Sequence, residues 1–103
     1  MNGKVLTLLG FASKAGALSY GAGSATESIN RKKAKGVLYA FDISPKSQKE
    51  IEFHCKKANV PAYKLSDIGM ESLSKAVGRK CGVVAILSDN FLTPLTPYLI
   101  SDI

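Results

Sequence analysis

The sequence predicts one α/β domain in which a mixed or parallel sheet lies between layers of helices. Three apolar segments typical of buried strands alternate along the chain with segments whose apolar residues recur at helical spacing. The 103 residues suffice for one compact domain and are too few for two. Because no repeat, low-complexity segment or linker divides them, residues 1–103 are predicted to form a single domain.

The first helix is predicted over residues 2–14, because its apolar residues recur three and four positions apart and share one face. These residues are Val5, Leu8, Leu9 and Ala12. Gly16 then supplies a left-handed stop, and Lys14 lies in the last turn, where a cation complements the negative end of a helix. Residues 17–23 are predicted to form a glycine-bearing loop.

A second helix and a buried strand follow this loop. Ser24 can cap the helix, and Glu27 three residues later completes a capping-box pattern. We expect the helix to run to about Lys33. Residues 36–41, GVLYAF, are a short apolar run rich in strand-forming residues, which predicts a strand buried on both faces.

The middle of the chain predicts a helix and an edge strand. Ser44 and Pro45 mark a helix start, because proline at the first helical position loses no hydrogen bond. Asn59 is expected to end this helix. Residues 60–64 predict the second strand, and Pro61 places it near an edge of the sheet or at the beginning of the strand.

The last third of the chain predicts a helix, a strand and a final helix. The segment MESLSKAV opens at Asp67 or Met70 and closes at Gly78. Residues 83–88, VVAILS, form the third clear strand. Asp89 can cap a last helix, whose regularity is limited by two prolines: these are Pro94 and Pro97.

The charge of the chain is positive and unevenly distributed. The formal net charge is +6. Residues 1–35 carry six lysines and arginines against Glu27 alone, whereas residues 86–103 carry Asp89 and Asp102 and no base. A basic end and an acidic end suggest a surface for a polyanion, although a solubilising surface has the same composition. Charge alone does not choose between RNA, DNA and a lipid surface.

Composition excludes several classes of protein. Hydrophobic residues make up 46% of the chain, enough to bury a core, so intrinsic disorder is excluded. Two cysteines are too few for a disulfide framework. No apolar run approaches the roughly 20 residues of a membrane-spanning helix, and residues 1–16 lack the pattern of a cleavable signal. A reduced, cytoplasmic setting is therefore expected.

Enzyme motifs are weak, and we expect no catalysis, cofactor or metal. Gly21 and Gly23 before a helix resemble the start of a dinucleotide fingerprint, but Thr26 stands at the third glycine position and a helix precedes the loop. The remaining signal is a helix N-terminus that could hold a phosphate, or equally a plain glycine turn. His54 is the only histidine, and Cys55 beside it is expected to lie in the core.

Several segments in register resemble one family. These are LLGFASKAGALSYG, INRKKAKGVLYAFDISP, NVPAYKL, LSKAVGRK and VVAILSDNF. Together they cover residues 8 to about 91 and resemble the ribosomal protein L7Ae/L30e family, particularly its small bacterial YlxQ-type members. The resemblance implies a three-layer α/β/α sandwich around a mixed four-stranded sheet, with the fourth, short strand near residues 17–20.

The resemblance also implies an RNA ligand. Many members of the family bind kink-turn RNA through the N-terminus of the second helix and the loop before the last strand. The family pattern at that helix is G-T-N-E-x-x-K. Gly21 matches it, whereas Gly23 and Ser24 replace the usual Asn and Glu, and Glu27 replaces a lysine that contacts phosphate. The like charge of Glu27 would make that contact repulsive. The loop at residues 78–82 is shorter and more basic than the apolar loop of kink-turn binders.

The residues still offer a route to RNA. Backbone and hydroxyl donors come from the second helix, and cations from its end and from the loop before the last strand. Arg79 could also stack on an unpaired base. The candidate RNA-binding residues are Gly21, Gly23, Ser24, Arg31, Lys32, Lys33, Arg79 and Lys80.

The sequence therefore predicts a noncatalytic protein that binds a structured, kink-turn-like or ribosomal RNA, with no membrane and no small-molecule substrate as partner. An alternative is a protein–protein interaction module on the same fold that has lost its RNA contacts. A nucleic-acid enzyme or a small-ligand binder is the least favoured interpretation. The oligomeric state is left open.

Overall fold

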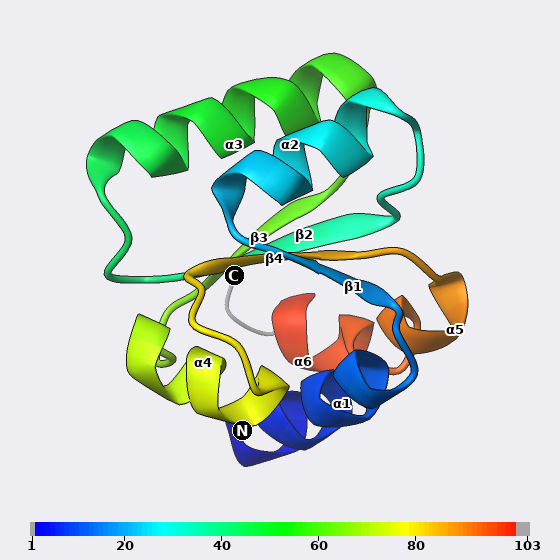
Figure 1. Cartoon of the computed structure of the whole chain (residues 1–103), viewed down its shortest axis with the longest axis vertical. Coiled ribbons are helices and arrows are strands. Elements are labelled where there is room, and N and C mark those ends of the chain that lie inside the picture. Colours follow the sequence, from blue (N-terminus) through cyan, green and yellow to red (C-terminus); the bar gives the residue numbers. More distant parts are fainter. Residues whose placement is uncertain (1, 101–103) are drawn as a thin grey trace.

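The computed structural model describes residues 2–100 (Figure 1). Within these residues, four strands and six helices follow one another. They are α1 (Asn2–Lys14), β1 (Leu18–Tyr20), α2 (Ala22–Asn30), β2 (Gly36–Ala40), α3 (Pro45–Ala58), β3 (Ala62–Leu65), α4 (Met70–Val77), β4 (Val83–Ile86), α5 (Asp89–Leu92) and α6 (Thr96–Ile100).

The strands form one mixed sheet in the order β1-β4-β2-β3. β2 and β3 are parallel, whereas β4 runs antiparallel to both of its neighbours. Figure 1 shows α2 and α3 on one face of the sheet and the other four helices on the opposite face. The three-layer sandwich with a mixed four-stranded sheet is thus confirmed, including the short strand expected near residues 17–20.

Alternation along the two central strands divides the core into two clusters. In β2, Val37 and Tyr39 face α2 and α3, whereas Leu38 and Ala40 face the layer of α1 and α4. All residues of β2 and β4 are buried, as expected for strands covered on both faces. Cys55 lies in the α2–α3 cluster, which confirms its predicted core position.

Four of the predicted helix boundaries are confirmed. Gly16, with a φ of 71°, ends the turn after α1, and Asn59 and Gly78 adopt left-handed conformations after α3 and α4. The Ser44 hydroxyl accepts a hydrogen bond from the Ser47 N–H in front of Pro45. β3, which follows Pro61, is an edge strand as predicted.

Other local predictions were wrong. The segment expected to be loop at residues 17–23 contains β1 and the start of α2. Ser24 does not cap α2, because Gly21 adopts the N-cap conformation and the helix begins at Ala22. The helix ends at Asn30 and not near Lys33.

The last helix also differs from the prediction. Ser88, not Asp89, is its N-cap, and the Ser88 hydroxyl accepts the Asn90 N–H. Two short helices, α5 and α6, replace the single helix because Pro94 lies between them.

Candidate nucleic-acid interface

The amino end of α2 lies against the start of β4. The Gly21 N–H donates a 2.8 Å hydrogen bond to the Val83 carbonyl. Gly21 has φ 88° and ψ 158°, a region that glycine occupies without strain. No side chain caps this helix end. The N–H groups of its first turn, at Ala22, Gly23 and Ser24, therefore remain as hydrogen-bond donors for a ligand.

The loop at residues 78–82 is fixed to α4 by one side chain. The Ser74 hydroxyl donates to the Cys81 carbonyl at 3.0 Å and accepts from the Cys81 N–H at 2.9 Å. These two hydrogen bonds to the backbone of Cys81 set the position of the two preceding residues, Arg79 and Lys80. Because Ala40 N–H also donates to the Gly82 carbonyl, the loop is held at its end by the sheet.

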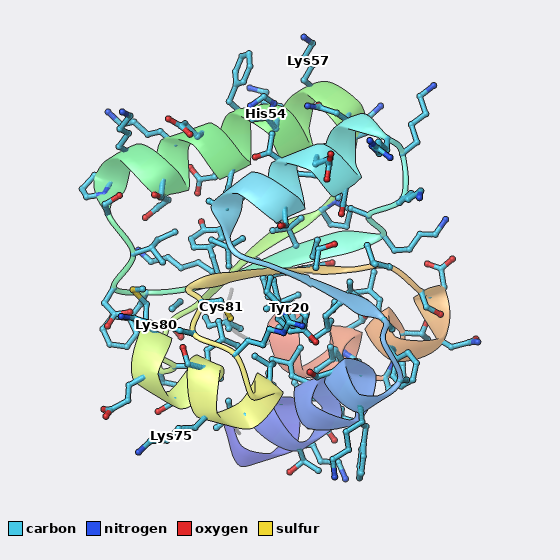
Figure 2. All side chains as sticks on the ribbon, in the orientation of Figure 1. Tyr20, His54, Lys57, Lys75, Lys80 and Cys81 are labelled. Carbon is cyan, nitrogen blue, oxygen red and sulfur yellow. The ribbon has the colours of Figure 1, made fainter. Side chains whose placement is uncertain are left out.

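Arg79 and Lys80 point to different neighbours. The Arg79 guanidinium lies over the Tyr20 ring, 4.9 Å from its centroid. Lys80 instead lines a small pocket with Met70, Ser74 and residues of the outer face of α4. Figure 2 shows Tyr20 below the sheet and Lys80 near α4. Arg79 thus stays beside the strand that leads into α2, whereas Lys80 extends the surface toward α4.

Tyr20 is itself fixed by a hydrogen-bond chain. The Ser13 hydroxyl donates to the Val77 carbonyl at 2.6 Å, which uses its only proton. The Tyr20 hydroxyl, 2.7 Å away, must therefore donate to the Ser13 oxygen. This chain ties β1 to the ends of α1 and α4, so the ring beneath Arg79 has a defined position.

A pocket of 390 Å³ opens between α2, α3 and the loop before β4. Its apolar lining includes Ile43 and Met70, and its hydroxyls come from Ser44 and Ser47. Gly82 allows the loop before β4 to lie close to Ile43, since an added Cβ would lie 2.6 Å from the Ile43 Cγ2. Nothing in the sequence pattern marks these residues as a site, because three distant segments converge here. The one usable signal is that the chain before each of α2, α3 and β4 contains glycine or serine.

The amino end of α4 joins the same edge of the sheet. The Asp42 carboxylate accepts the Met70 N–H at 2.8 Å. Asp42 lies two residues after the end of β2, so this bond links the end of the strand to Met70, which lines the pocket. A carboxylate at this position also satisfies the positive end of α4.

Arg31, Lys32 and Lys33 lie at the other end of α2. Lys35 N–H pairs with the carbonyl of Ile86, the last residue of β4, whereas Gly21 pairs with its first residue. The nine residues of α2 separate the two ends by about 13 Å. These cations therefore do not lie beside the amino end of α2, although they are candidates for the same interface.

Charges on this end of the molecule are partly compensated. Arg31 pairs with Glu27 at 3.4 Å, and both side chains are exposed. Asp89 does not lie on the side of the molecule opposite to the cations at residues 31–35. It begins α5, which follows β4 at the end of the sheet where β2 begins. Leu92 of α5 indeed lies against Gly36. Asp102 lies outside the described residues.

The two cysteines are buried and free. Burial raises the pKa of the Cys55 thiol to about 11, and burial also raises the pKa of Cys81. Both therefore stay protonated at neutral pH and are poor nucleophiles. Within residues 2–100, no three metal-ligating side chains gather as a group that could hold an ion. None of the helices described is both long and apolar enough to span a bilayer.

The architecture defines an α/β/α sandwich, and comparisons assign its family. The sequence profile of the ribosomal protein L7Ae/L30e/S12e/Gadd45 family matches residues 3–93. The chain therefore belongs to this family. No curated protein matches the sequence significantly.

Two solved structures share the fold. A protein of unknown function from Bacillus halodurans C superposes with a TM-score of 0.85 and 20% identity, covering 92% of this chain and 95% of its own. The Giardia lamblia 15.5kD RNA binding protein superposes with a TM-score of 0.78 and 22% identity, covering 96% of this chain and 87% of its own.

Proposed function

We propose that the chain is a noncatalytic RNA-binding protein of the cytoplasm that associates with ribosomal or another structured, kink-turn-like RNA. The observation that carries this proposal is the hydrogen bond between Gly21 and Val83, which sets the uncapped amino end of α2 beside the loop at residues 78–82. Donors for phosphate and a fixed cation are thereby brought to one edge of the sheet.

Family membership supports an RNA-binding role for this edge of the sheet. Members of the family use the amino end of the second helix and the loop before the last strand for RNA, and both elements are present here. One structural neighbour is named as an RNA binding protein. The net charge of +6 supports a polyanionic partner.

Each part of the edge would serve a different contact. The N–H groups at Gly23 and Ser24 can bond phosphate oxygens, and the partial positive charge of the helix end strengthens those bonds. Arg79 can add a charged contact from its position over Tyr20. The pocket beside Ile43 and Met70 can accept an unpaired base on its apolar lining.

One observation favours the alternative of a protein-interaction module. Glu27 stands where the family usually has a phosphate-binding lysine. Its carboxylate lies on the exposed face of α2 and forms an ion pair with Arg31. A loss of RNA affinity at this helix would leave the fold intact, since both side chains lie outside the core.

Fluorescence anisotropy with a kink-turn RNA and a matched unbent duplex, each at two salt concentrations, tests the proposal. We expect tighter binding of the kinked RNA, and we expect the difference to persist at the higher salt, because shape recognition does not depend on counterion release alone. Equal and steeply salt-dependent binding would indicate a nonspecific basic surface. Absence of binding would favour the interaction module.

A further inference from the structure

A second concave surface lies away from the interface described above. It is a groove of 620 Å³ between the carboxyl ends of α2 and α3. Its apolar floor is formed by Ile29, Ala34 and Val60. We call it the α2–α3 groove. A volume of this size falls within the range of pockets that hold a small organic group, such as one nucleotide.

The rim of the α2–α3 groove is cationic. Lys32, Lys35 and Lys57 line it together with His54, and the described lining residues include no aspartate or glutamate. Figure 2 shows His54 and Lys57 on the α3 side of the sheet, far from Lys80. An apolar floor under a basic rim is complementary to a ligand with a flat apolar part and a negative charge.

The backbone conformation of Lys32 is set by the way α2 ends. Its φ is 61°, in the left-handed region that glycine or asparagine occupies at lower cost. Lys32 lies two residues after Asn30, the last residue of α2. The N–H groups of Lys32 and Lys33 bond the carbonyls of Ile29 and Ser28, which is a common left-handed helix ending. From this position Lys32 lines the groove, and its charge also complements the negative end of α2.

An exposed aromatic ring stands beside the groove. Phe53 on α3 is 62% exposed, and its ring meets the His54 ring edge to face with centroids 5.4 Å apart. Lys49, Lys56 and Lys57 lie three or four positions away and are exposed, as is Glu50, so cations outnumber the acid around this ring. Aromatic rings among cations are the usual platform for unpaired bases, because stacking and phosphate attraction act together.

We propose that the α2–α3 groove and Phe53 form a second nucleic-acid contact, which binds unpaired nucleotides of RNA. One base stacks on Phe53, and a neighbouring nucleotide enters the groove with its base on the floor and its phosphate on the lysines. The choice of RNA as ligand rests on the proposed function. The location does not, because this surface is separated by the length of α2 from the amino end of that helix.

The test uses a fluorescein-labelled oligouridylate that has no secondary structure, and the full chain with Phe53→Ala. We expect oligouridylate binding to weaken at least about fivefold, since stacking of one base is lost. Phe53→Tyr should restore the affinity. Phe11→Ala is the matched control, because Phe11 is 57% exposed on α1, in the other helical layer. Equal affinity of wild type and Phe53→Ala would overturn the proposal, as would an equal loss in Phe11→Ala.

A charge-matched pair tests the groove itself. Lys35→Ala with Lys57→Ala removes two rim cations, and Lys4→Ala with Lys14→Ala removes two exposed cations of α1. Loss of two phosphate contacts should reduce the salt slope for single-stranded RNA by about 1.4 in the first pair only. The same slope in both pairs would mean general electrostatic attraction and would overturn the proposal.

Kink-turn RNA with and without a single-stranded uridine extension separates this proposal from the preceding one. If the extension adds affinity that Phe53→Ala removes, the second contact is supported whether or not the kinked stem binds. If the kinked RNA binds and the extension adds nothing, the second contact is refuted alone. Binding of a polyglutamate peptide that oligouridylate does not displace would assign the groove to an acidic protein segment instead.

Discussion

The Arg79 guanidinium lies 4.9 Å from the centre of the Tyr20 ring, so the loop before β4 contacts the strand that leads into α2. The Tyr20 hydroxyl is bonded to Ser13, which prevents the ring from turning away. A cation–π contact uses the charge of the guanidinium and leaves its N–H groups able to donate hydrogen bonds. One contact therefore both fixes the loop and presents donors to a phosphate.

Removal of the loop cations should weaken RNA binding without unfolding the domain. In Arg79→Ala with Lys80→Ala, two charges are lost from the edge that also carries the amino end of α2. We expect weaker binding of kink-turn RNA in anisotropy and a salt slope less steep by about 1.8 if both contact phosphate. The free energy of unfolding should change by less than about 1 kcal/mol, because an exposed cation–π contact contributes little.

Lys4→Ala with Lys14→Ala serves as control, because both lysines are exposed on α1. It lowers the net charge equally but at a different surface. Unchanged RNA affinity in the loop variant would remove residues 79 and 80 from the interface.

Reversal of the charge at Glu27 should strengthen binding to kink-turn RNA. Glu27→Lys breaks the 3.4 Å ion pair with Arg31 and directs two cations outward from successive turns of α2. One additional phosphate contact would steepen the salt slope by about 0.9. The stability cost should stay within about 0.5 kcal/mol, as for other exposed pairs. Glu27→Gln separates the two effects, because it releases Arg31 and adds no charge. If neither variant gains affinity, this face of α2 does not meet the RNA.

Loss of the Ser74 hydroxyl should loosen the loop at residues 78–82. Ser74→Ala leaves the N–H and carbonyl of Cys81 without this partner, at a cost of about 1–3 kcal/mol of stability. We expect a lower melting temperature, faster amide exchange at Cys81 and weaker RNA binding. Ser72→Ala is the matched control, since Ser72 is exposed on the same helix. If the two variants are equally stable, the Ser74 bonds do not hold the loop.

The order of the elements could be predicted from the sequence because each has a local signal. The alternation of apolar segments locates β2 and β4, and Ser44 with Pro45 marks the start of α3. β1 has only three residues and no such signal. Its strand conformation depends on pairing with β4, a segment more than sixty residues away, which a local pattern does not contain.

The site was predictable only in part, for a similar reason. Gly21 and Arg79 lie on one edge, as expected, because a helix start and a strand start meet there. The cations at residues 31–33 follow Gly21 closely in sequence, yet they lie at the far end of α2. Contacts of Tyr20 with Arg79, and of Asp42 with Met70, join segments that only the folded sheet brings together.

The buried thiol of Cys55 should make the fold less stable at alkaline pH. Burial raises its pKa to about 11, with a smaller contribution from Glu52, whereas an exposed thiol titrates near 9. Between these values the unfolded chain loses the proton first, so the free energy of unfolding falls as pH rises from about 9 to 11. Below pH 9 both states keep the proton, and the contribution is complete.

Urea unfolding of wild type and Cys55→Ala over pH 8 to 11 measures this effect. The variant should be less stable at pH 8, because it loses buried volume, but its stability should fall less steeply above pH 9. Cys81→Ala provides a second comparison, since burial raises that pKa too. Parallel curves for wild type and Cys55→Ala would show that Cys55 does not carry the alkaline loss.

Two glycines two positions apart should respond oppositely to alanine. At Gly21, with φ 88° and ψ 158°, an alanine meets no neighbour within 4 Å but is strained by its backbone angles, at a cost of about 1–3 kcal/mol. At Gly23, inside the first turn of α2 with open space around it, alanine should stabilise the helix by up to about 1 kcal/mol.

Denaturant unfolding of the two variants measures this contrast, and RNA affinity shows whether it matters for binding. Relief of strain in Gly21→Ala requires the start of α2 to rotate, which weakens the bond from residue 21 to the Val83 carbonyl. We therefore expect Gly21→Ala to lose affinity for kink-turn RNA even under conditions in which the variant is fully folded. Gly23→Ala keeps the backbone donor and should bind as wild type. An equal loss of affinity in both would mean that the RNA needs the bare Cα surface of residue 23 and not only the placement of the helix end.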